Sequence, residues 1–148
     1  MSIWRVTPDP EVLTKRAAGS MLGFLGIVFT EAGPDFLRAT LPVGERTVQP
    51  YGLLHGGASV ALAESLGSVA STCCIDTERY MCVGQEINAN HLRGVPSGNT
   101  VTATARPFHL GARSHVWHIE IRDSSERLVC VSRLTMAIVE RRAQATAS

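Results

Sequence analysis

The chain has 148 residues and a mass of 15.9 kDa, the usual size of one domain, and 45% of its residues are hydrophobic, which is enough for a core. The 14 Lys and Arg residues nearly balance 13 Asp and Glu residues, and no basic run is interleaved with aromatics, so nucleic acid is not an expected partner. No apolar stretch approaches the roughly 18 residues of a membrane span, and the first residues lack the apolar run of a signal peptide. We therefore expect a cytoplasmic protein with no membrane partner.

The N-terminal third is predicted to form a short helix and a hairpin. Thr7 as a helix cap, followed by prolines and acids, predicts a helix over about residues 8–18. Two apolar segments, 26–32 and 36–41, flank the turn-forming Gly33-Pro34-Asp35 and predict two paired strands.

The rest of the chain predicts one long helix and four strands. Residues 56 to about 72 contain no proline, few β-branched residues and many alanines and leucines, as expected of a helix. Strands are expected where turn-forming segments separate apolar ones, over residues 80–93, 100–108, 114–122 and 127–140. Residues 140–148 are expected to be a frayed tail.

These elements predict an α+β fold in one domain covering residues 1–148. A helix of ~17 residues spans ~25 Å and a strand of ~10 residues spans ~33 Å, so the helix can lie along most of the sheet. We expect a curved antiparallel sheet wrapped around one long central helix.

The predicted central helix has two faces of different composition. One is an apolar stripe that should pack on the sheet, made of Ala58, Leu62, Leu66, Val69 and Cys73. The opposite face holds small residues and one acid: Gly57, Val60, Ala61, Glu64, Ser68 and Ser71. A helix exposed to solvent would carry more charge there, so this face predicts contact with a second chain.

The acid on that face is a candidate catalytic residue. Glu64 is the one ionisable carboxylate between residues 51 and 75, and burying a lone acid is costly unless it is paired, protonated or functional. Ser68 lies one helical turn later, from where its hydroxyl can reach the carboxylate or a water beside it.

The start of the helix is a candidate oxyanion site. Gly56 and Gly57 leave backbone N–H groups uncovered at the positive end of the helix dipole, which suits a developing negative charge. Gln49 and His55 precede them, and together with Glu64 these residues predict a catalytic site.

The segment from Gln49 through Gly52-Leu53-Leu54-His55-Gly56-Gly57 to Glu64 and Ser68 resembles the signature of hotdog-fold acyl-CoA thioesterases. The similar branch includes 1,4-dihydroxy-2-naphthoyl-CoA and enterobactin-proofreading thioesterases, related to 4-hydroxybenzoyl-CoA thioesterase. The resemblance implies the hotdog fold and hydrolysis of acyl-CoA thioesters, with aromatic acyl groups expected, to free acid and coenzyme A.

The resemblance also implies residue roles. The acid at Glu64 acts as nucleophile or general base, and the N–H at Gly56 donates to the thioester oxygen. Gln49 and His55 help hold that carbonyl, and Ser68 orients the acid or a water. The residues implied in binding coenzyme A are Gly84, His91, Leu92, Arg93, His109, Leu110, Gly111, Ala112, Arg113 and Ser114.

Two positions depart from the family pattern and leave the acyl group open. Val69 stands where relatives often carry methionine, and Gly94 where a proline is common. The physiological donor is also open between coenzyme A and a carrier protein. No cofactor is implied beyond the coenzyme A of the substrate.

Helix geometry predicts a shared site. Gly56 and Glu64 are eight residues apart, or ~12 Å along a helix, whereas reacting atoms must lie within ~3–3.5 Å. One site must therefore combine Gly56 of one chain with Glu64 of another. We expect at least a homodimer, and the resemblance implies a homotetramer.

No metal site is expected. Cys73 and Cys74 are adjacent and no C-x-x-C occurs, while His115 and His118 on one strand would point to opposite faces. Two alternative functions stay open: a dehydratase or hydratase of 3-hydroxyacyl thioesters, and a non-catalytic acyl-CoA-binding protein. The His-Gly-Gly then Glu spacing fits hydrolysis better than hydration.

Overall fold

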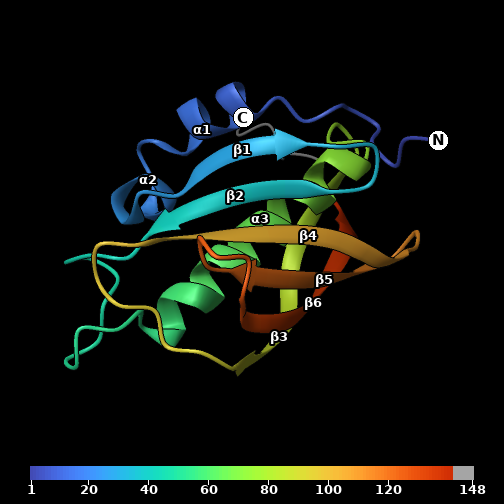
Figure 1. Cartoon of the computed structure of the whole chain (residues 1–148). Coiled ribbons are helices and arrows are strands. Elements are labelled where there is room, and N and C mark those ends of the chain that lie inside the picture. Colours follow the sequence, from blue (N-terminus) through green and yellow to red (C-terminus); the bar gives the residue numbers. More distant parts are fainter. Residues whose placement is uncertain (142–148) are drawn as a thin grey trace, which may run out of the picture.

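The computed structural model describes residues 1–141 of the chain (Figure 1). In chain order, the helices and strands of this part are α1 (Pro10–Ala17), α2 (Met21–Leu25), β1 (Val28–Ala32), β2 (Leu37–Pro42), α3 (Gly56–Cys74), β3 (Tyr80–His91), β4 (Thr100–Leu110), β5 (Ser114–Arg122) and β6 (Leu128–Glu140). The predicted helices and strands are present, with small shifts at their ends. Of the predicted tail, Glu140 ends β6, Arg141 donates its backbone N–H to Arg79, and residues 142–148 lie outside the described residues.

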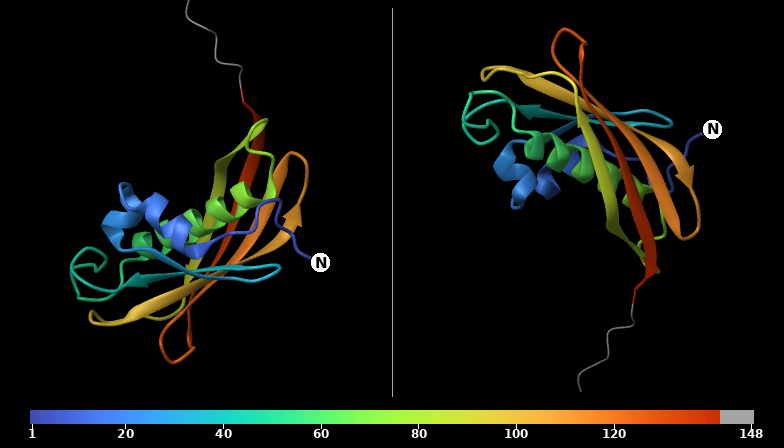
Figure 2. Two further views of the ribbon diagram at one scale, coloured as in Figure 1. Left: turned by 90° about the horizontal axis from the view of Figure 1, so that it is seen from above. Right: turned by 90° about the horizontal axis from the view of Figure 1, so that it is seen from below.

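The six strands form one antiparallel sheet in the order β1-β2-β4-β5-β6-β3. The sheet curves around α3, while α1 and α2 lie beside β1 (Figure 2). The α+β hotdog architecture is therefore confirmed. Strands β1 and β3 are the two edges of the sheet. The sequence did not predict this order, because β3 pairs with the distant β6 and not with β4, the next strand in the chain.

The core lies between the sheet and α3. Strand β5 alternates as predicted, with Trp117, Ile119 and Ile121 fully buried toward the helix. Gly67 lets the helix approach the sheet closely, since a Cβ there would lie 2.5 Å from Leu134 Cδ2.

The face that α3 presents to the sheet is rotated from the predicted one. Leu62 and Leu66 are buried as expected, but Val69 and Cys73 are only half-buried. They line a cavity with residues of α1, α2 and β1, because the N-terminal helices cover that side of α3. The buried residues of α3 are Ser59, Leu62, Ala63, Leu66, Gly67, Ala70 and Ser71. The assignment of Ser71 to the partner-facing side was therefore wrong.

The N-terminal region differs from prediction in its details. Asp9, not Thr7, caps α1, and its carboxylate accepts from the N–H groups of Glu11 and Val12. The five-residue helix α2 was not predicted. Before α1, the Trp4 ring stacks on the Trp117 ring with centroids 6.3 Å apart, and its Nε1 donates to the Gly33 carbonyl.

Candidate active site

The start of α3 leaves one backbone donor free. His55 is the N-cap, and its Nδ1 accepts from Gly57 N at 2.8 Å. The His55 carbonyl accepts from the N–H groups of Ala58 and Ser59. Within residues 1–141, the N–H of Gly56 has no hydrogen-bond partner, so it is the donor at the positive end of α3 that remains for a ligand.

The Gln49 side chain is oriented by the loop that precedes α3. Its Oε1 accepts from the backbone N–H of Tyr51, so its NH₂ group is the end that can donate to a ligand. The loop turns at Gly52, whose φ of 76° favours glycine. This turn brings Gln49 to the cavity at the start of α3.

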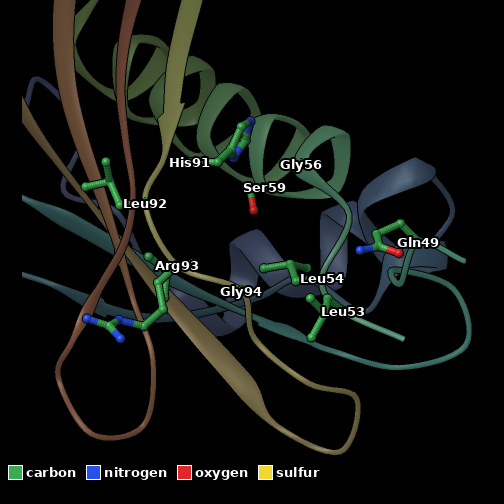
Figure 3. Close-up of a pocket in the computed structure, with 10 residues that line it drawn as sticks. Gln49, Leu53, Leu54, Gly56, Ser59, His91, Leu92, Arg93 and Gly94 are labelled. Carbon is green, nitrogen blue, oxygen red and sulfur yellow. The ribbon is translucent and has the colours of Figure 1, made fainter. Parts of the chain in front are cut away.

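A cavity of about 270 Å³ lies between this loop, the start of α3 and the residues that follow β3 (Figure 3). It contains five predicted site residues: Gln49, Gly56, His91, Leu92 and Arg93. The His91 imidazole lies against Gly56, because a Cβ on that glycine would be 2.9 Å from His91 Nε2. The remaining lining residues are Leu53, Leu54, Ser59, Gly94 and Val129.

Glu64 lies elsewhere on α3 and faces the edge strand. Its carboxylate contacts Gly84 of β3, where a Cβ would lie 2.6 Å from Glu64 Oε1. Glu64 is half-buried, and it makes no salt bridge or side-chain hydrogen bond within the described part of the chain. Gly84 and Glu64 are therefore brought together, and Gly84 contacts the acid itself.

Ser68 does not hold the Glu64 carboxylate in this chain. Its hydroxyl contacts Met136 Sδ at 3.6 Å instead. The helical spacing that suggested the contact is correct, but the sheet offers Ser68 a different neighbour.

The segment 109–114 is separated from this cavity. It forms the turn between β4 and β5, at the opposite end of the molecule from the loop before α3 (Figure 1). Leu110, Gly111 and Ala112 line a second cavity of about 340 Å³, together with Asp76 and Tyr80. His109 lies over Gly111, and the Arg113 carbonyl accepts from the backbone of Ile138; Ser114 begins β5. Nine of the ten implied coenzyme-A residues thus fall into two distant groups within one chain, and the tenth, Gly84, lies against Glu64.

Sequence reasoning missed Ser59 in the first cavity. The signal was a serine three residues after Gly56, where an alanine would suit the helix better. It was treated as an ordinary helical residue because the predicted stripe placed Ala58, not Ser59, toward the sheet.

The cysteines do not form a reactive centre. Burial raises the pKa of the Cys73, Cys82 and Cys130 thiols, and it raises that of Cys74 to about 12. These thiols stay protonated at neutral pH and are poor nucleophiles. Among residues 1–141, no cluster of three or more His, Cys, Asp or Glu side chains could hold a metal ion. No helix in this region is long and apolar enough to cross a membrane.

The fold and the site define an enzyme of the thioesterase class, and comparison with known proteins agrees. The family model described as the thioesterase superfamily matches residues 51–130. The chain belongs to this superfamily and has its hotdog domain.

Individual relatives cover nearly the whole chain. The 1,4-dihydroxy-2-naphthoyl-CoA hydrolase of Escherichia coli K12 is 53% identical over 137 residues, which are 93% of this chain and 99% of that protein. The proofreading thioesterase EntH of Cronobacter sakazakii is 48% identical over 138 residues, 93% of this chain and 98% of that protein.

Solved structures are equally similar. A mutant of thioesterase PA1618 from Pseudomonas aeruginosa superposes with a TM-score of 0.92 at 53% identity, covering 95% of this chain and 100% of that one. Thioesterase HI1161 from Haemophilus influenzae gives 0.91 at 45% identity, covering 97% and 99%.

Proposed function

We propose that this thioesterase hydrolyses acyl-CoA thioesters with aromatic acyl groups. The observation that carries the proposal is the free N–H of Gly56, which faces a cavity beside the donor end of Gln49. A carbonyl oxygen placed there would meet two donors and the positive end of a 19-residue helix. The relatives named for aromatic acyl-CoA hydrolysis and for proofreading support the substrate class.

The residues around the cavity support a mechanism. The Gly56 N–H and the Gln49 amide polarise the thioester carbonyl. His55 Nδ1 accepts from the Gly57 N–H, so Nε2 is the ring nitrogen that can donate. His55 is exposed and does not line the cavity, so its contact with the carbonyl is proposed from the resemblance. Glu64 then attacks the carbonyl carbon to give an anhydride, which water hydrolyses, or it removes a proton from an attacking water. Either route consumes one water and releases one acid and one thiol.

We infer a homodimer as the smallest active unit. Gly56 lies against His91 and Glu64 lies against Gly84, so the N–H donor and the acid contact different points of β3. Gly56 and Glu64 are ~12 Å apart along α3. Strand β3 is an open edge of 12 residues, and two such edges can pair antiparallel about a twofold axis.

That pairing would also unite the two groups of coenzyme-A residues. The His91 end of one β3 would lie beside the Tyr80 end of the other, where Leu110, Gly111 and Ala112 line the second cavity. Pairing of two such dimers into the homotetramer implied by the resemblance is a further part of this proposal.

The activity is tested by release of free thiol from a panel of aryl, short-chain and long-chain acyl-CoA thioesters. We expect release to be fastest with benzoyl-CoA and to persist in EDTA, because the proposed chemistry uses side chains and backbone alone. A 3-hydroxyacyl dehydratase or a non-catalytic acyl-CoA-binding protein would release no thiol from benzoyl-CoA. The same acyl groups on a carrier protein test which thioester is preferred.

The shared site is tested by mixing two inactive variants, Glu64→Ala and the double variant His55→Ala/Gln49→Ala. After joint refolding about half of the dimers are mixed, and each mixed dimer holds one intact and one doubly altered site. We expect about a quarter of the wild-type activity per chain, because half of the dimers are mixed and one of the two sites in each is intact. A mixture as inactive as its parents, with mixed dimers shown by native mass spectrometry, would contradict the cross-chain site.

A further inference from the structure

A second hydroxyl of α3 lies inside the cavity at its start. Ser59 is three residues after Gly56, and only 2% of the residue is exposed. Figure 3 shows its side chain pointing from α3 into the space between the loop before α3 and residues 91–94. The backbone N–H of Ser59 donates to His55, so its place at the helix start is fixed.

The Ser59 hydroxyl is available to a ligand. It makes no hydrogen bond with any residue among 1–141, although a helical serine often donates to the carbonyl four residues earlier. Among the described residues, every fully enclosed side-chain nitrogen or oxygen has a hydrogen-bond partner. The Ser59 oxygen has none, so it is not fully enclosed and is open to the cavity. A hydroxyl that the protein leaves without a partner and that opens onto a cavity can donate to a group bound there.

The cavity is chemically suited to the thiol side of the substrate. The carbonyl oxygen is assigned to Gly56 N–H at one wall, and the proposed acid reaches the carbonyl from the partner chain, outside the cavity. The exposed Arg93 lines the cavity with its side chain directed away from α3, where it can meet an anionic arm (Figure 3). The sulfur would then lie inside the cavity, near Ser59.

We propose that Ser59 is a catalytic residue that donates a hydrogen bond to the departing sulfur; this rests on the proposed thioesterase function. When the tetrahedral intermediate collapses, an oxygen lone pair re-forms the C=O bond, and the C–S bond breaks with its electron pair leaving on sulfur. The thiolate then takes a proton from water. Ser59 keeps its own proton and stabilises the charge while the bond breaks.

The first experiment varies the leaving group. Ser59→Ala should lower kcat about tenfold with benzoyl-CoA, the scale of one hydrogen bond to a charged group. The loss should shrink to about twofold or less with the phenyl thioester of the same acid, because an aryl thiolate is already stable. Ser132→Ala is the matched control, since Ser132 is also 2% exposed but lies in β6 away from the cavity, and its kcat should not change with either substrate. An equal loss with both leaving groups, or no loss, would overturn the role.

The second experiment separates this role from the proposed function. The parent and Ser59→Ala are titrated calorimetrically with coenzyme A and with desulfo-coenzyme A, at a pH where the thiol is ionised. We expect the parent to prefer coenzyme A about tenfold, and Ser59→Ala to lose that preference while binding desulfo-coenzyme A as before. If Ser59→Ala still preferred coenzyme A over desulfo-coenzyme A, the contact between Ser59 and sulfur would be refuted while the proposed thioesterase function would stand. A parent that neither binds coenzyme A nor releases thiol would refute the proposed function, and this role with it.

Discussion

Two buried serines of α3 show how differently the two ends of this helix are built. Ser71 is 0% exposed and its hydroxyl accepts from Trp117 Nε1 at 2.6 Å, with His115 Nδ1 at 3.2 Å. Ser59, 12 residues earlier, is almost as buried at 2% but has no partner within the described chain. One polar group is fully used by the fold, and the other is left for a ligand.

The surroundings of the two ends agree with this division. The last turn of α3 is held by the N-terminal segment, since the Cys73 carbonyl accepts from the N–H groups of Arg5 and Val6 and Asp76 pairs with Arg5. The first turn instead faces a cavity and keeps the Gly56 N–H free. The difference teaches that two equally buried hydroxyls can differ in whether the fold supplies a hydrogen-bond partner, and only the one without a partner is open to a group in a cavity.

The largest expected effect belongs to the acid between the two ends. Glu64→Gln keeps the size and much of the hydrogen-bonding capacity of the side chain but removes its charge. We expect kcat to fall by about three decades or more with the fold intact, measured by thiol release and circular dichroism. Activity within tenfold of the parent would show that another acid performs the chemistry.

Two glycines sharpen the contrast between site and core. A Cβ at Gly84 would lie 2.6 Å from Glu64 Oε1, so Gly84→Ala should displace the carboxylate and lower kcat by about tenfold to a hundredfold at nearly unchanged stability. Gly67→Ala is its counterpart, because that Cβ would meet Leu134 Cδ2 at 2.5 Å in the core. It should cost about 1–3 kcal/mol of unfolding free energy. Equal stability loss in the two variants would contradict this division.

The serine comparison itself can be tested by stability. Ser71→Ala leaves Trp117 Nε1 buried without its acceptor and should cost about 1–3 kcal/mol in urea unfolding, with kcat and KM retained. Ser59→Ala removes no protein hydrogen bond among residues 1–141, so its free energy of unfolding should stay within about 0.5 kcal/mol of the parent value. If the two variants lose stability equally, Ser59 has a structural partner.

The smallest effect is a pH dependence at the Ser71 end. The Ser71 hydroxyl accepts from Trp117 Nε1 and also forms a hydrogen bond with His115 Nδ1, in which the tautomer of the His115 ring decides which atom donates. Burial, and then the nearby His109, lower the pKa of His115 below its ordinary value of 6.5. Because the folded-state pKa of His115 is lowered, the stability that the neutral ring contributes is fully present above pH ~6.5 and is lost as the pH falls below it.

Urea midpoints at pH 7 and pH 5 measure this loss. His115→Gln should be less stable than the parent at pH 7 but should lose less stability on acidification. A parallel pH dependence in the two proteins would assign the effect to other groups.

Much of the fold could be predicted because periodicity and turn residues are local signals. Strand β5 was predicted with its observed bounds, and α3 is two residues longer than expected. The position of β3 at a sheet edge and the short helix α2 depend on long-range packing, which local patterns do not record.

The candidate site was predicted in part for the same reason. Gln49, Gly56 and His91 were all predicted site residues, and they line one cavity. Ser68 contacts Met136 because the sheet position that faces it could not be known from helical spacing. Ser59 was missed because its environment is formed by three segments distant in sequence.

The stacked pair Trp4 and Trp117 has a spectroscopic consequence. These are the only two tryptophans of the sequence, and their rings lie 6.3 Å apart with an angle of 9° between planes. Intrinsic fluorescence therefore reports the first residues of the chain and the centre of the sheet as one signal. Replacing Trp4 by Phe would leave a single emitter whose indole N–H is bound to Ser71, so the loosening of that end of α3 could be followed without any added label.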